Sequence, residues 1–145
     1  MPNKVSRHQR IAAVLAALLA WASAGAAPNL AIALNSADGT ISLIDSETYK
    51  VIGKTPVCKE PHHLMPTPDD KSLIVACSAS NQLVFFDPLT GKEQRRIRDI
   101  SDPYQIGFSP DNKFFVSNSL RLDRVDIYDA LTVKLKARLH APRTP

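Results

Sequence analysis

The sequence lacks the short motifs that identify several large classes of enzyme. It has five glycines in 145 residues and no glycine-rich segment suited to holding a phosphate. It also has no serine in a nucleophile-elbow motif and no pair of carboxylates in a catalytic pattern. Most acidic residues fall in predicted turns, where solvation and local hydrogen bonds account for them. We therefore expect neither catalysis by this chain nor a bound cofactor.

The sequence also lacks an apolar run of the roughly 20 residues that are needed to cross a bilayer. Its most apolar stretch, residues 11–21, follows a basic start and precedes the small residues 22–27. This arrangement, with an A-x-A site, is typical of a secretory signal peptide. We assign residues 1–26 to the signal, with cleavage after Ala24 or Ala26. The expected product is periplasmic or secreted, without a stable membrane span.

The mature chain has no surplus of basic charge. The net charge of +4 falls to +1 when Lys4, Arg7 and Arg10 of the signal are removed. Nucleic-acid binding requires a basic face on the folded domain, so we expect no nucleic-acid partner. One basic cluster remains on a predicted outer edge strand, where charges commonly block unwanted strand pairing. It comprises Lys92, Arg95, Arg96 and Arg98.

What the sequence does contain is a repeat of 42 residues that runs without a gap. A D-x-x-T-x-K pattern occurs three times, and Pro61, Pro103 and Pro145 keep the same step. An aspartate in such a segment accepts backbone hydrogen bonds and closes a tight turn, so we interpret these residues as structural. The Asp and Thr positions are Asp45 and Thr48, Asp87 and Thr90, and Asp129 and Thr132.

Within each repeat the apolar residues follow the pattern of β-strands. They alternate with their neighbours ahead of each repeated aspartate, and short apolar runs indicate buried strands. Antiparallel four-stranded units repeated every 40–50 residues are propeller blades. The predicted strands are 30–35, 40–45 and 50–55 in the first unit, 63–67, 72–77, 82–87 and 92–98 in the second, and 105–109, 114–119, 124–129 and 134–140 in the third.

These strands predict an all-β fold made of propeller blades in an incomplete ring. Residues 29–60 form the first blade, which lacks its first strand. Residues 61–102 form the second blade, and residues 103–145 form the third with the start of the next repeat. Sheet faces left uncovered at the two ends would expose apolar surface, so we expect self-association.

Two kinds of segment carry a resemblance to a known family. The turns at residues 67–71 and 109–113 are similar to a family turn of the form S-P-D-G-K, and residues 41–45 are similar to its V-x-V-I-D strand end. On these motifs the chain resembles the YVTN-type β-propeller repeat proteins of bacteria over residues 29–145. The resemblance implies a closed ring, commonly of seven blades. Because this chain supplies just under three, we expect a truncated or partial propeller, or several copies assembled head-to-tail.

Side chains that do not repeat gather at one predicted end of the blades. The connections between blades and the loops joining second and third strands open on the same side. We predict that Cys58, His62 and His63 lie in the connection into the second blade, and that Cys77 ends its second strand. Together with Tyr104, the counterpart of His62, the two histidines are our candidate binding residues near the mouth of the channel.

Three interpretations of the two cysteines stay open. Two cysteines in an exported protein favour a disulfide between Cys58 and Cys77. They can instead be unpaired small side chains, because Cys77 occupies the place of Asn35 and Ser119 in the other repeats. The third interpretation is a metal or haem held by the thiols with His62 and His63, although the spacing matches no recurrent site.

The function predicted from these features is that of an exported scaffold for a protein or small-molecule ligand. Two alternatives come from the resemblance. Some relatives of these repeats hold a haem or support quinone-dependent oxidation in the periplasm, and lactonase-type hydrolases share the propeller shape.

Overall fold

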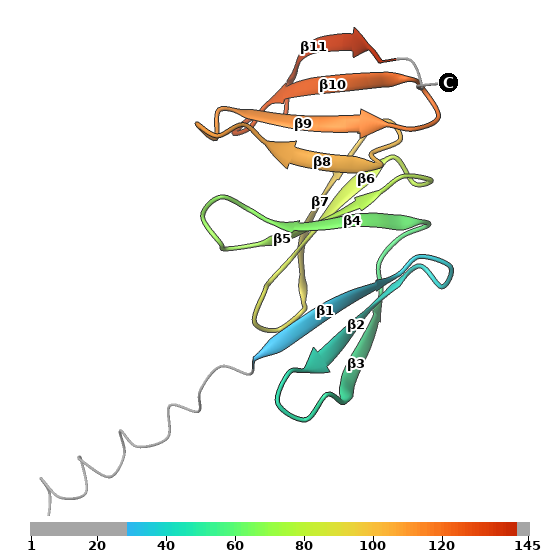
Figure 1. The fold of residues 1–145 in the computed structure, drawn as a ribbon, viewed down its shortest axis with the longest axis vertical. Coiled ribbons are helices and arrows are strands. Elements are labelled where there is room, and N and C mark those ends of the chain that lie inside the picture. The colour runs from blue at the N-terminus through green and yellow to red at the C-terminus, as the bar shows by residue number, and fades with distance from the viewer. Residues whose placement is uncertain (1–28, 142–145) are drawn as a thin grey trace, which may run out of the picture.

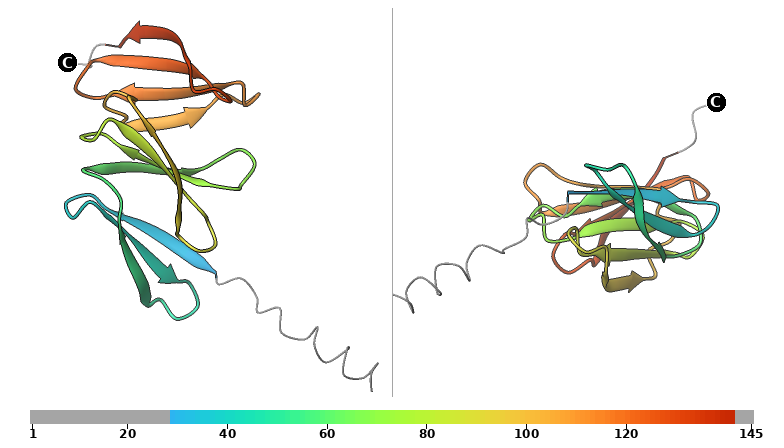
Figure 2. Two further views of the ribbon diagram at one scale, coloured as in Figure 1. Left: turned by 180° about the vertical axis from the view of Figure 1, so that it is seen from behind. Right: turned by 90° about the horizontal axis from the view of Figure 1, so that it is seen from below.

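The computed structural model describes residues 29–141, which form β-strands arranged in three antiparallel sheets. The sheets stack along the long axis of the molecule (Figure 1), and seen along that axis they overlap one another (Figure 2). The predicted signal peptide lies outside the described residues. Within residues 29–141 no helix is long and apolar enough to cross a membrane.

The first sheet has three strands and the other two have four each. In each sheet, strands that follow one another in the chain pair with each other. The fold class predicted from the repeat is therefore confirmed, and the ring is not closed. The strands are β1 (Leu30–Asn35), β2 (Thr40–Asp45) and β3 (Val51–Pro56), then β4 (Pro61–Pro66), β5 (Leu73–Cys77), β6 (Gln82–Phe86) and β7 (Glu93–Arg98), then β8 (Gln105–Phe108), β9 (Phe114–Ser119), β10 (Arg124–Asp129) and β11 (Leu135–His140).

Strand β4 differs from the sequence prediction in a way that matters for the site. It begins at Pro61, two residues earlier than expected, so His62 and His63 lie on the strand and the predicted placement in the connection is wrong. Proline is tolerated as the first residue of a strand, because no ladder hydrogen bond from its nitrogen is needed there. Pro61 pairs with Cys77 and His63 with Ala76, which leaves His62 as the extra residue of a bulge.

The same side-chain arrangement closes the turn between the last two strands of every sheet. Asp87 Oδ1 accepts hydrogen bonds from the backbone of Leu89 (2.9 Å) and Thr90 (2.8 Å) and from Thr90 Oγ1 (3.0 Å). Asp45 and Asp129 accept corresponding bonds from Thr48 and Thr132. Because these bonds favour the charged form, they lower the pKa of each of the three carboxyl groups.

The turn requires a left-handed backbone four residues after the aspartate. Gly91 adopts it with φ 64°, and a Cβ there would lie 2.5 Å from Leu43 Cδ2 of the neighbouring sheet. Tyr49 and Val133 occupy the same position with φ 56° and 55°. Glycine suits this conformation without strain, whereas an L-residue with a side chain does not.

The middle sheet is buried on both faces and holds the stack together. All five residues of β6 are buried, and so are residues 74–77 of β5. Such short unbroken apolar runs are the pattern expected of a strand with no solvent-facing side. Val84 and Phe86 pack with Ile41 of the first sheet, while Leu83 and Phe85 pack on the opposite face with residues of the third. Burying a side chain such as Phe86 contributes about 1.5–3 kcal/mol.

The face of the third sheet that carries the core residue Tyr128 also holds a cluster of charged side chains. Asp126, whose side chain is 1 % exposed, lies 2.7 Å from Arg138 Nε and 3.2 Å from Arg124 Nη2. Burial acts to raise the pKa of Asp126, but the hydrogen bond from Arg138 and the charge of Arg124 outweigh it, and the pKa is lowered. Burial and the nearby carboxylate raise the pKa of Tyr128 to about 12. Asp126 is therefore a buried charged residue that the two arginines of its own sheet stabilise.

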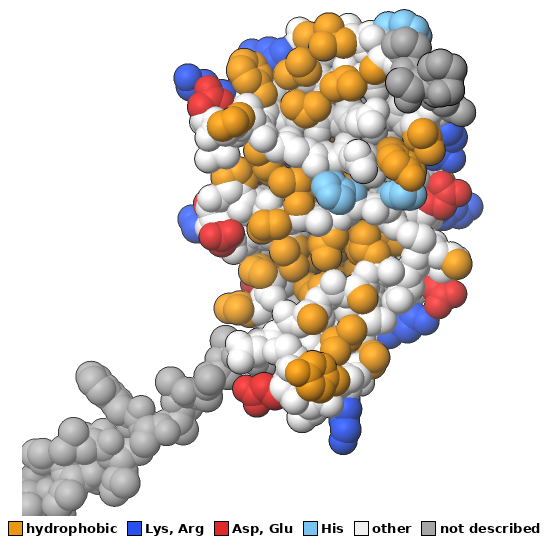
Figure 3. Space-filling model, viewed as in Figure 1, with side chains coloured by type: hydrophobic (Ala, Val, Ile, Leu, Met, Phe, Trp, Pro, Cys, Tyr) orange, Lys and Arg blue, Asp and Glu red, His pale blue; other side chains and the backbone are white. Residues whose placement is uncertain are grey.

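The outer face of the third sheet has no neighbour among the described residues. Hydrophobic side chains gather over β10 and β11 in Figure 3. Leu135 and Leu139 of β11 are 46 % and 52 % exposed. Apolar area of this kind is what the self-association prediction rests on.

Replacing Tyr49 with glycine should stabilise the fold. Tyr49 has φ 56° and is 84 % exposed, so Tyr49→Gly relieves backbone strain with little loss of packing. We expect the free energy of unfolding to rise by about 0.5–1 kcal/mol, measured by urea denaturation. The matched control is Glu47→Gly in the same turn, which lies outside the left-handed region and should lower stability. A decrease for Tyr49→Gly equal to that of the control would contradict this account of the turn.

Candidate functional site

The loops at one end of the three sheets surround a hollow of about 460 Å³, which we call the mouth. The loops after β1, β5 and β9 contribute to it, as do the connections that lead into β4 and β8. Residues spaced by 42 therefore face the same space, as the repeat predicts. The lining residues are Ser36, Ala37, Glu60, His62, Ser78, Asp102, Tyr104, Leu120 and Arg121.

Two aromatic rings from adjacent sheets meet in the mouth. The ring centroids of His62 and Tyr104 are 3.7 Å apart, with an angle of 37° between the ring planes. The bulge in β4 changes the direction of His62 relative to a regular strand. Tyr104 is held just before β8 by its backbone N–H, which donates to Asn118 O at 2.9 Å. The pair gives the mouth an aromatic wall that joins the second and third sheets.

A charged cluster also lines the mouth. The backbone N–H of Arg121 donates to Asp102 Oδ2 at 2.6 Å, and its guanidinium lies 2.9 Å from Asp102 Oδ1. A second guanidinium nitrogen lies 3.4 Å from Glu60 Oε2. The side chain of Asp102 is 5 % exposed, whereas those of Arg121 and Glu60 are 50 % and 56 % exposed. Arg121 is thus anchored by a buried carboxylate while it remains accessible to a ligand.

Hydrogen bonds fix the loop that carries Glu60. Its backbone oxygen accepts from the N–H of Ser78 at 3.1 Å, and its Oε2 accepts from Ser78 Oγ at 3.2 Å. Ser36 Oγ of the first sheet donates to the backbone oxygen of Pro61. The three sheets are therefore tied together around the mouth. An aromatic wall, a carboxylate and a guanidinium can together contact both the apolar face and the hydroxyl groups of a small ring-shaped molecule.

A disulfide between Cys58 and Cys77 lies beside the mouth. It ties the connection that precedes β4 to the end of β5. In the third sheet a hydrogen bond makes a similar link, because Ser119 Oγ donates to Ser101 O at 2.9 Å. With both sulfurs bonded to each other, the two thiols of the metal hypothesis are not free to act as ligands. No group of three or more metal-binding side chains occurs within residues 29–141.

The two histidines predicted to act together have separate environments. His62 is exposed and contacts Tyr104, whereas His63 is partly buried and its Nδ1 accepts a hydrogen bond from Ile106 N at 3.1 Å. The backbone of Ile106 belongs to β8, the strand at one edge of the third sheet. His63 therefore connects two sheets that share no backbone ladder. The structure places His62 and Tyr104 in the mouth and does not place His63 there.

Sequence reasoning missed Glu60, Asp102 and Arg121. We expected most acidic residues to lie in turns and did not single out Glu60 and Asp102, both of which line the mouth. Comparison of the repeats contains the signal that would have found them. Glu60 and Asp102 are acidic residues 42 apart, and Arg121 occupies the position that alanine holds in the other two repeats. When one repeat has a charged residue at a position where the other repeats have a small residue, that position is a candidate for a functional site.

Comparison with family models decides the classification. A model described as a YNCE-like β-propeller matches residues 8–145. The chain belongs to this family. The resemblance to bacterial propeller repeats that the turns and strand ends indicated is therefore confirmed. A comparison with curated proteins found no match.

Solved structures similar to this member of the YNCE-like family share its fold. Hydrazine synthase of Kuenenia stuttgartiensis is 22 % identical with a TM-score of 0.63, over 77 % of this chain and 32 % of that one. The periplasmic gluconolactonase PpgL of Pseudomonas aeruginosa is 17 % identical with a TM-score of 0.64, over 78 % and 37 %. A functionally unknown protein from Desulfotomaculum acetoxidans is 18 % identical with a TM-score of 0.64, over 79 % and 37 %. The chain thus spans about a third of each of these structures.

Reduction of the disulfide should destabilise the protein measurably. The two cysteines are 19 residues apart, and closing a loop of this length contributes about 3 kcal/mol. We expect dithiothreitol to lower the free energy of unfolding of the wild-type protein by about this amount in urea titrations. The double variant Cys58→Ala, Cys77→Ala is the control and should not respond to dithiothreitol. Two free thiols per chain in a non-reducing thiol assay would contradict the bond.

Proposed function

We propose that this chain is an exported ligand-binding scaffold, and that its mouth binds a small polyhydroxyl compound of the sugar or sugar-acid class. The observation that carries the proposal is the combination of His62 and Tyr104 with Glu60 and Arg121 around one hollow. A sugar ring presents an apolar C–H face and a rim of hydroxyl groups. The aromatic wall suits the face, and the carboxylate and guanidinium suit the rim.

Two further features support export and a rigid site. The pattern over residues 1–26 is that of a signal peptide, and disulfides persist in oxidising compartments. Export requires a mature N-terminus at residue 25 or 27, which mass spectrometry of the secreted protein would measure. The disulfide and the hydrogen bonds from Ser36 and Ser78 hold the loops of the mouth before a ligand arrives. Preorganised loops lose less entropy on binding.

Hydrolysis of a lactone is the second candidate function. Glu60 and Arg121 lie side by side in the mouth, where a carboxylate could activate water and a guanidinium could stabilise an oxyanion. The name of one similar structure, a periplasmic gluconolactonase, points to the same substrate class. Of the haem ligands considered from the sequence, His62 lies in the mouth. A haem absorption spectrum of the purified protein is the observation that would favour the redox alternative.

Binding should depend on the aromatic wall of the mouth. We would titrate the protein with D-glucose, D-gluconate and glucono-1,5-lactone by ligand-observed NMR. His62→Ala should weaken binding roughly threefold to tenfold, as expected for an aromatic contact worth about 0.5–1.5 kcal/mol. His140→Ala is the matched control, because His140 is an exposed histidine on β11.

The outcomes separate the candidate functions. Binding without turnover of the lactone supports the scaffold, whereas turnover that Glu60→Gln abolishes supports the hydrolase. If none of the three compounds binds, the sugar-class assignment is wrong. Equal weakening by His62→Ala and His140→Ala would show that the mouth is not the binding site.

A further inference from the structure

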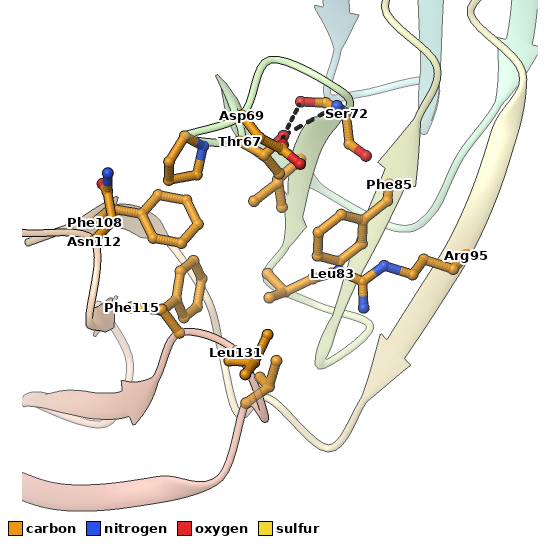
Figure 4. A pocket seen from close by; sticks show the side chains of 14 residues that line it. Thr67, Asp69, Ser72, Leu83, Phe85, Arg95, Phe108, Asn112, Phe115 and Leu131 are labelled. Carbon is orange, nitrogen blue, oxygen red and sulfur yellow. Dashed lines mark hydrogen bonds between the residues drawn. The ribbon is translucent and has the colours of Figure 1, made fainter.

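A second hollow lies between the second and third sheets, at the strand ends opposite the mouth. We call it the basal cavity; its volume is about 310 Å³. The turn after β4 and the turn before β11 contribute to it, so it faces away from the loops that form the mouth. Figure 4 shows Phe85, Phe108, Phe115 and Leu131 around this space, with Arg95 at its edge. The lining is mostly apolar.

The residues that give the basal cavity its character do not repeat. It holds three of the five phenylalanines of the chain, together with an arginine. Phe85 and Phe115 also pack in the core between the second and third sheets, so what distinguishes this space is the kind of side chain present. One repeat earlier, the positions of Phe85, Phe108, Phe115 and Arg95 are occupied by Leu43, Pro66, Leu73 and Gly53.

Two charged side chains, Arg95 and Asp69, line the opening of the basal cavity, which we call its rim. Within residues 29–141, Arg95 is the one of the two that forms no ion pair. Its guanidinium carbon lies 3.8 Å from the ring centroid of Phe85, and no described carboxylate forms an ion pair with it. The acid at the rim, Asp69, is already engaged: it accepts from Thr67 Oγ1 at 2.7 Å and lies 3.8 Å from Lys71 Nζ. An anion bound at the rim could therefore form an ion pair with the guanidinium of Arg95.

The size of the cavity restricts the apolar part of a ligand. A dry cavity of about 150 Å³ holds one benzene molecule, so 310 Å³ accommodates a phenyl ring with a short chain. Phe108 and Phe115 already form an edge-to-face pair with centroids 5.4 Å apart. A third ring can join such a pair at a separation of about 4.5–7 Å. The short chain then leads from the ring to the rim.

We propose that the basal cavity binds a small aromatic carboxylate, with its ring among the three phenylalanines and its carboxylate on Arg95. The inference is independent of the function proposed for the mouth. The ligand must carry both an aromatic ring and a carboxylate. The neutral amide of the same shape keeps the ring contacts and loses the charge interaction.

The test compares 3-phenylpropionate with 3-phenylpropionamide by isothermal titration calorimetry on the full mature chain. We expect the acid to bind about twofold to fivefold more tightly than the amide, in keeping with an ion pair to an exposed arginine. Arg95→Gln should remove this preference and leave the affinity for the amide unchanged. Arg98→Gln is the matched control, since it removes the same charge from an exposed position of the same strand. A second variant, Ala130→Phe, fills the cavity and should abolish binding of both compounds.

Several outcomes would overturn the proposal. One is that the folded wild-type protein binds neither compound, or binds both equally. Another is that Arg95→Gln and Arg98→Gln reduce the affinity for the acid to the same extent. A loss of binding in His62→Ala with none in Arg95→Gln would place the ligand in the mouth instead. Self-association that 3-phenylpropionate suppresses would assign the cavity to a side chain of a second copy.

Discussion

The fold depends on contact between the faces of neighbouring sheets. A four-stranded antiparallel sheet whose two faces are both apolar is not stable alone in water, and the second sheet here is of that kind. Every residue of β6 is buried, because the first sheet covers one face and the third covers the other. The repeat follows from this requirement, since each sheet must present a face that fits the next.

The same requirement explains where the chain is free to vary. Positions that pack between the sheets are apolar, and the buried Asp126 has charged partners. Outside the aspartate-closed turns, which all three sheets share, several positions near the ends of the strands differ between the repeats. The mouth collects His62 and Arg121 at positions where other repeats have different residues, and the basal cavity collects phenylalanines at the opposite ends. The repeated sheets thus hold two sites, the mouth and the basal cavity, and each contains side chains that are not shared by all the repeats.

Much of this architecture could be predicted from the sequence. The strands, the three aspartate-closed turns and the missing strand of the first sheet all follow from local patterns with a fixed spacing. The bulge at His62 could not be predicted in this way, because it depends on how Pro61 pairs with Cys77 on the next strand. The link from Arg121 to Glu60 was also out of reach, since 61 residues separate them and the contact crosses two sheets. For the cysteines, three interpretations stayed open from the sequence, and the fold brings Cys58 and Cys77 together as a disulfide.

Native-state amide hydrogen exchange tests the central claim most directly. Exchange protection reports the free energy needed to open each segment, so it separates strands that are covered on both faces from those covered on one. If burial between neighbouring sheets stabilises the fold, β5 and β6 should be the most strongly protected strands, and β2 and β10 should open at lower free energy. Protection of β2 or β10 equal to or greater than that of β5 and β6 would contradict the account.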